Sequence, residues 1–139
     1  MNWLANALLS ALFAGLVAIF GKIGMKDIDS TVATTARAFI MCLTLVIVLV
    51  CKRNFGALAL IAPKAWLYVT LAGLAGAASW LFYFQALKLG DASKVAPIDR
   101  LSIIITLALA AIFLGEKLST GVLIGSGLIL AGALLVARG

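Results

Sequence analysis

The chain is poor in the side chains that most enzymes and metal sites require. It has no histidine, five acidic residues of which one is a glutamate, and two cysteines among 139 residues. Without a nucleophile and base at a recognisable spacing, we expect no enzymatic activity, no cofactor and no metal site. Cys42 and Cys51 lie within or at the edge of apolar runs, which predicts that both are small buried hydrophobic residues.

Charge of either sign is also scarce. Only 12% of the residues are charged, 65% are apolar, and the mean hydropathy is +1.22. Soluble chains have about 25% charged residues, so this composition excludes a soluble domain. A membrane-spanning helix takes roughly 20 residues, which leaves room for about five spans and no separate soluble domain.

Five long apolar runs predict an all-α membrane protein, a bundle of five transmembrane helices in a single domain of residues 1–139. The runs are near 3–20, 32–51, 65–87, 95–114 and 121–137. They are continuous and rich in alanine and leucine, without the period-two alternation of a membrane β-barrel. The first run lacks a basic segment before it, so we do not expect a cleaved signal peptide. The apolar linker 54–62 is read either as a loop or as a short segment in the membrane interface.

The net charge of +6 comes from scattered lysines and arginines, which is typical of helix ends at lipid headgroups and not of a nucleic-acid groove. An odd number of spans places the termini on opposite sides of the membrane. The side of the amino terminus then carries four basic residues, Lys52, Arg53, Lys64 and Lys117, and the other side carries five, Lys22, Lys26, Lys88, Lys94 and Arg138. This near balance favours insertion in both orientations, and a single orientation stays the alternative.

Polar side chains inside the spans are the strongest candidates for function, because each is costly in hydrocarbon. Arg37 lies about six residues inside the second span, roughly 9 Å along its axis. It continues a polar stripe with Thr34, Met41 and Thr44 at helical spacing. In the fourth span, Asp99, Ser102 and Thr106 share one face, with Pro97 expected in the first turn.

The second and fourth spans begin on the same side of the membrane. Arg37 and Asp99 lie near these two starts at similar depth, so they are candidate partners. They are read either as a substrate vestibule or as a static ion pair near the headgroups. Lys22 and Arg100 are candidate gate or interface charges, with Arg100 otherwise extending outward to the headgroups. Trp80, Tyr83 and Gln85 close the third span, where aromatic residues form either an interfacial belt or the wall of a ligand pocket.

Small residues in the fifth span indicate close helix packing. Gly121 and Gly125 form a small-xxx-small pair, and Gly132 continues the pattern. With the glycine-rich third span, they favour contact between chains, and therefore an oligomer.

Several stretches resemble the EamA domain of the drug/metabolite transporter superfamily. They are Tyr83–Leu87, Ala92–Pro97, Phe113–Leu118, Gly125–Gly132, Phe20-Gly21-Lys22 and Arg37. Members usually contain two such five-helix domains in opposite orientations. A chain with one domain therefore implies an antiparallel homodimer, as in inverted-repeat transporters. After Pro97, family members typically continue with apolar and small residues, and Asp99-Arg100 departs from that pattern.

The resemblance implies a secondary transporter for a small organic metabolite or drug-like solute, in the lipid bilayer of a prokaryotic inner membrane. One alternative is a non-transporting or accessory subunit that pairs with a homologous domain. Another is a proton-coupled multidrug exporter similar to the small multidrug resistance family. Those exporters use an acidic residue in the first span, which this chain lacks.

Overall fold

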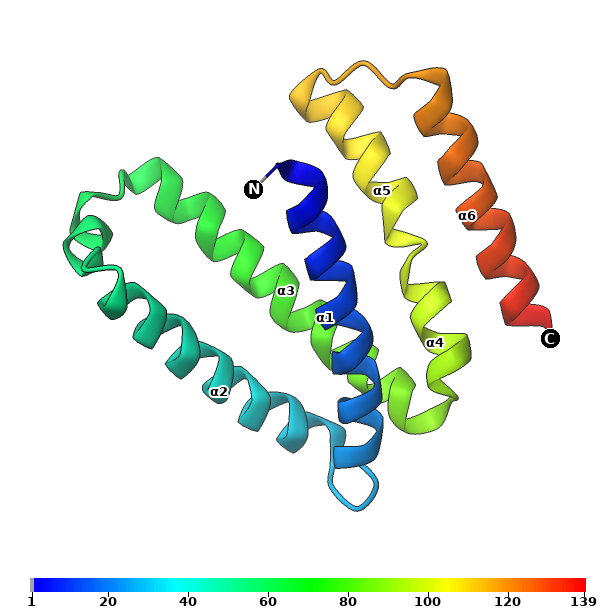
Figure 1. Cartoon of the computed structure of the whole chain (residues 1–139), viewed down its shortest axis with the longest axis horizontal. Helices are drawn as coiled ribbons and strands as arrows, with labels where there is room; N and C mark the ends of the chain where they lie inside the picture. The colour runs from blue at the N-terminus through cyan, green and yellow to red at the C-terminus, as the bar shows by residue number, and fades with distance from the viewer. Residues whose placement is uncertain (1) are drawn as a thin grey trace. The chain divides into compact units, whose positions relative to one another are not determined.

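The computed structural model describes residues 2–139, which contain helices and no strand. The elements are α1 (Trp3–Gly24), α2 (Ser30–Cys51), the 3₁₀ helix η1 (Phe55–Leu60), α3 (Pro63–Leu89), α4 (Ala92–Asp99), α5 (Ser102–Leu109), the π-helical turn η2 (Ala110–Leu114) and α6 (Thr120–Arg138) (Figure 1). Five segments are long and apolar enough to cross a membrane, with α4, α5 and η2 together forming the fourth. The all-α class and the five predicted spans are confirmed. The apolar linker contains η1.

The chain divides into two compact units, which are described separately. The α2–α3 unit comprises Gly21–Lys88, and the α4–α6 unit comprises the residues up to Phe20 together with Leu89–Gly139. That residues 1–139 form a single five-helix domain stays a prediction. In the α4–α6 unit, α6 packs along α4 and, less extensively, along α5.

One end of the α2–α3 unit, which we call the closed end, is held by polar contacts between the end of α3 and residues 22–28. Lys22 Nζ donates to the Leu87 carbonyl at 2.6 Å, and Lys88 Nζ donates to the Ile28 carbonyl at 2.8 Å. Basic groups near the end of α3 also interact favourably with its helix dipole. Asp29 caps α2 by accepting from the backbone N–H groups of the two residues after Ser30, and these bonds lower the pKa of its carboxyl.

At the same end, α1 approaches α3 at a glycine. A Cβ added at Gly21 would lie 3.1 Å from both Cε1 and Cζ of Phe84, whose side chain is buried. We expect Gly21→Val to destabilise the protein by about 1–3 kcal/mol, because the packed ring cannot easily move aside. Gly15→Val is the matched control, since a Cβ there meets nothing within 4 Å. Thermal unfolding in detergent micelles measures both, and equal melting temperatures would contradict the close approach.

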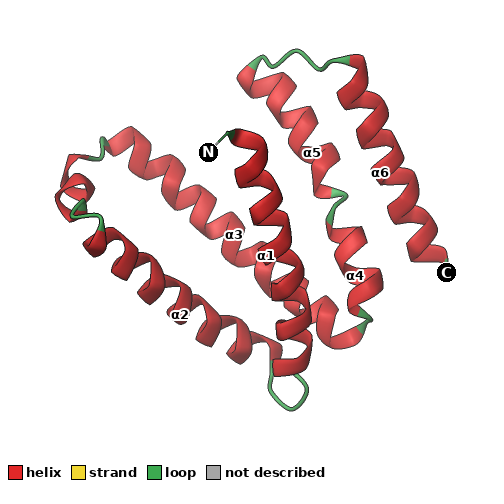
Figure 2. Cartoon of the chain, viewed as in Figure 1, coloured by secondary structure: helices red, strands yellow, loops and turns green. Residues whose placement is uncertain are grey.

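The fourth span is interrupted between α4 and α5, where Figure 2 shows a loop. Arg100 and Leu101 donate their N–H groups to carbonyls three residues back, at 3.2 and 2.9 Å. Pro97 was expected in the first turn, and this is wrong: α4 begins at Ala92, so the proline lies in the helix interior. A proline there removes one backbone hydrogen bond and clashes with the turn before it, whereas the interruption follows at residues 100 and 101.

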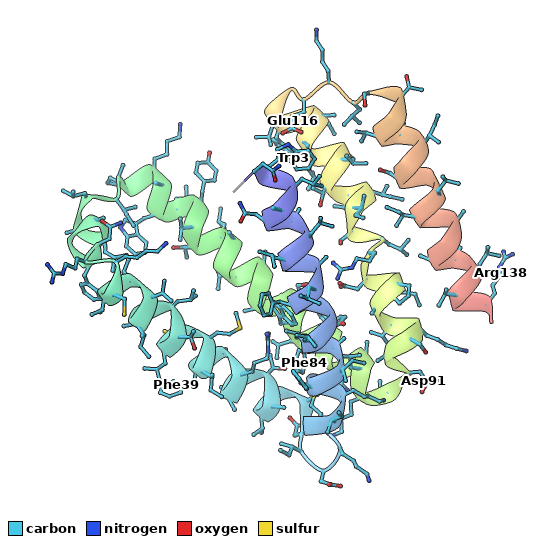
Figure 3. The ribbon with its side chains drawn as sticks, viewed as in Figure 1. Trp3, Phe39, Phe84, Asp91, Glu116 and Arg138 are labelled. Carbon is cyan, nitrogen blue, oxygen red and sulfur yellow. The ribbon has the colours of Figure 1, made fainter. Side chains whose placement is uncertain are left out.

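Large apolar side chains cover the outer faces of the helices and remain exposed on the isolated chain. The prediction that Cys42 and Cys51 are buried is wrong, since both are exposed. The physical reason is that lipid-facing helices do not need other helices to cover their apolar side chains. Phe39 illustrates this: it points outward from α2 and is 72% exposed (Figure 3).

Candidate functional site

A cavity of about 700 Å³ lies between α2 and α3, and we call it the Arg37 groove. The two helix backbones stay apart along most of their length, which leaves the groove open between them. Its walls are mostly apolar. The lining includes Thr34, Thr35, Arg37, Met41, Leu45 and Trp80. Small residues of α3, Gly73, Gly76 and Ala77, form part of the facing wall.

Arg37 is held in the groove by aromatic rings of α3. Its guanidinium carbon lies 3.7 Å from the centroid of the Trp80 ring and 4.8 Å from that of Phe84. The two rings are 5.7 Å apart and tilted. They lie one helical turn apart on α3 and therefore share a face. Cation–π contacts of this kind strengthen where the cation is desolvated.

The edge of this guanidinium is poorly satisfied by hydrogen bonds. Nη1 donates to the sulfur of Met41 at 3.2 Å, and sulfur is a weak acceptor. Nε is buried and has no hydrogen-bond partner among the described residues. The neighbouring Thr34 and Thr35 hydroxyls donate to backbone carbonyls four residues back. Arg37 is the only charged residue among the described residues that line the groove.

The comparisons with known proteins identify the family. The model of the EamA-like transporter family matches residues 1–138. The chain belongs to this family. A similar protein from Sinorhizobium sp., described as an uncharacterized transporter in the cobO 3′ region, is 43% identical over 136 residues, covering 98% of this chain and 96% of that protein. No solved structure matches the chain.

For this EamA-like chain, the predicted site residues Arg37 and Trp80 lie together in the groove. Tyr83 is not part of the lining, and its ring lies 5.6 Å from that of Trp80 in an edge-on arrangement. Gln85 accepts a hydrogen bond from the Ser30 hydroxyl, and Lys22 binds the end of α3. The last two residues therefore hold the closed end of the unit, outside the lining of the groove.

The other predicted pathway residues of the EamA-like chain belong to the α4–α6 unit. Asp99 ends α4 and is exposed, and Arg100 follows it at the break. Asp99 ends α4 and Ser102 begins α5, so their predicted common face crosses the interruption and stays a prediction. Ser102 and Thr106 do share a face of α5, where the Thr106 hydroxyl donates to the Ser102 carbonyl at 2.9 Å. The pairing of Arg37 with Asp99 stays a prediction.

A second cavity, of about 490 Å³, lies within the α4–α6 unit of the EamA-like chain. Pro97 and Arg100 line it from the fourth span, and Gly132 lines it from α6. A Cβ added at Gly125 or Gly132 would meet nothing within 4 Å, and one at Gly121 would meet only Ser119 Oγ at 4.0 Å. These glycines therefore do not mark a close helix contact within the described chain.

Sequence reasoning placed Met41 on the stripe of Arg37, but it left Met41 and Phe84 out of the predicted pathway residues of the EamA-like protein. Phe84 forms the second ring beside Arg37, and Met41 is its hydrogen-bond acceptor. Both signals were available: Phe84 follows Trp80 by four residues, and Met41 follows Arg37 by four. Side chains at this spacing are neighbours on a helix.

Proposed function

We propose that this chain is a secondary transporter for a small organic metabolite or drug-like solute and acts by alternating access as an antiparallel homodimer. The observation that carries the proposal is the Arg37 groove. It is an apolar cavity whose one charged lining residue, Arg37, lies within a helix long and apolar enough to span a membrane. An ionisable group at such a position is costly and is usually part of a substrate or ion pathway. The family and the relative from Sinorhizobium support a transporter and not an enzyme.

The antiparallel homodimer rests on charge balance and on unfilled surface. Four basic residues on one side of the membrane against five on the other give little preference for one orientation. Gly125 and Gly132 leave open space that a helix of a second copy could approach closely. Two copies in opposite orientations would reproduce the arrangement of an inverted-repeat transporter.

Two other functions are weighed against this one. An accessory subunit would need a homologous partner domain for transport. A proton-coupled exporter similar to the small multidrug resistance family would use an acidic residue in the first span, and α1 has none. A transporter in a prokaryotic inner membrane, with lipid, a small-molecule substrate and a second copy as partners and no nucleic acid, is therefore the function we favour.

The purified chain reconstituted alone into liposomes tests this function. The liposomes are loaded with an isotope-labelled bacterial metabolite extract, and solute release is followed by mass spectrometry. We expect a small set of solutes to leave faster than from protein-free liposomes. Release only after a homologous domain is added would support the accessory subunit, and no accelerated release in either case would contradict transport.

A further inference from the structure

We propose that the Arg37 groove binds a soluble amphipathic organic anion, with the acidic group on the Arg37 guanidinium and the apolar body along α2. This inference rests on the proposed function, because it names the substrate class of the same groove. It is carried by three features together, namely the incompletely satisfied edge of the guanidinium, the absence of a second charge among the described lining residues, and the apolar walls.

The geometry of Arg37 leaves the hydrogen bonds of its edge incompletely satisfied. Trp80 and Phe84 contact the guanidinium through their rings, and rings cannot accept the in-plane N–H bonds of Nε and Nη. A carboxylate accepts such N–H bonds in pairs, and charge-assisted bonds are roughly twice as strong as neutral ones. The Met41 sulfur that now accepts from Nη1 is a weak acceptor that a carboxylate would displace with a gain in free energy.

The walls of the groove determine which chemical groups the body of the ligand can carry. From Arg37, the α2 wall continues through Met41 and Leu45 at helical spacing, and both side chains line the cavity. The Thr34 and Thr35 hydroxyls already donate within the helix. A ligand that extends from Arg37 along this wall therefore meets apolar side chains and few hydrogen-bond donors. An aromatic or branched aliphatic body fits this surface, and a polyhydroxylated body such as a sugar does not.

The charge of the groove also sets the ligands that it rejects. An organic cation would lie beside Arg37 with no carboxylate in the described lining to offset the repulsion. It could not use the Trp80 face, which the guanidinium occupies at 3.7 Å. A neutral amide of the same shape would accept fewer charge-assisted bonds. The expected order of affinity is therefore anion, then neutral analogue, then cation.

Contact quenching of Trp80 tests this order. A Trp3→Phe, Trp66→Phe variant leaves Trp80 as the only tryptophan, and it is placed in nanodiscs of phosphatidylcholine. The probes are 4-bromobenzoate, 4-bromobenzamide and 4-bromobenzylammonium, whose bromine quenches tryptophan on contact. We expect saturable quenching by the benzoate, at a dissociation constant at least about tenfold lower than that of the amide, and none by the ammonium. Equal quenching by the three probes would overturn the proposal.

Variants of Arg37 locate the bound anion. Arg37→Gln is expected to weaken benzoate binding at least about tenfold, to the level of the amide. Arg138→Gln, which removes the same charge at the end of α6, should leave it unchanged. If Arg37→Gln does not fold, Arg37→Lys keeps the charge but loses the planar donor pair, and it should bind the benzoate more weakly while still preferring it to the amide. Unchanged affinity in a folded Arg37→Gln variant would overturn the proposal.

Two other occupants of the groove are separate outcomes. If phosphatidylglycerol in the nanodisc abolishes quenching by the benzoate, the groove is an anionic-lipid site and the proposal is overturned. If no probe quenches saturably, the groove does not take a ligand of this class, with the same consequence. Benzoate binding without accelerated release from loaded liposomes would support the ligand class and contradict transport. Release restricted to neutral or cationic solutes would support transport and contradict the ligand class.

Discussion

Replacing Asp99 with asparagine is expected to reduce solute release from proteoliposomes to the level of protein-free liposomes. Asp99 is the last residue of α4, at the interruption of a membrane-spanning segment. Carboxylates inside such segments commonly belong to proton relays or substrate pathways. Interrupted helices are also where many transporters place their binding sites. The change keeps the shape of the side chain and removes its charge, so a large loss would assign the effect to the charge.

Asp91→Asn is the matched control for this prediction. Asp91 is an exposed aspartate at the start of the same span, and its side chain makes no capping hydrogen bond to α4. We expect transport by this variant to equal that of the unaltered protein. Both variants should elute as the same oligomer and show the same helix content. Full transport by a folded Asp99→Asn variant would remove Asp99 from the mechanism.

The limits of the five spans could be predicted because hydropathy and length report on the lipid, which every span meets directly. Each predicted run lies within the helical segment that the structure assigns to it. The interior position of Pro97 was missed because of three residues at the start of the fourth span. With a start at Val95, Pro97 falls in a tolerated first turn, whereas the observed start at Ala92 places it in the interior.

The environment of Arg37 could be predicted less well, because it depends on a second helix. Reasoning from charge paired it with an acid, Asp99. That pairing stays a prediction, and within the α2–α3 unit the contacts of Arg37 are with the rings of Trp80 and Phe84. Stacking and charge pairing are both favourable for a guanidinium, and the sequence of α2 alone does not distinguish them. The four-residue spacing of the two aromatics was the signal that pointed to a shared surface.

Fixing the chain in one orientation is expected to abolish transport, and mixing two oppositely fixed variants is expected to restore it. Lysines in cytoplasmic connections set orientation, and the present bias is small. Asn54→Lys with Gly56→Lys adds positive charge to the side of the amino terminus. Asp27→Lys with Ser93→Lys adds it to the opposite side. A reporter fused after Gly139, active only in the cytoplasm, measures the orientation of each variant.

The physical reason for this large effect is that an antiparallel pair needs one copy in each orientation. Either fixed variant alone can form only parallel pairs, in which both copies have the same orientation in the membrane. Alternating access between two sides would then lack its inverted half. Co-expression supplies both orientations and should return transport to the level of the unaltered chain. Full transport by one fixed variant alone would contradict the antiparallel homodimer and leave a parallel assembly, or a homologous partner domain, as the functional unit.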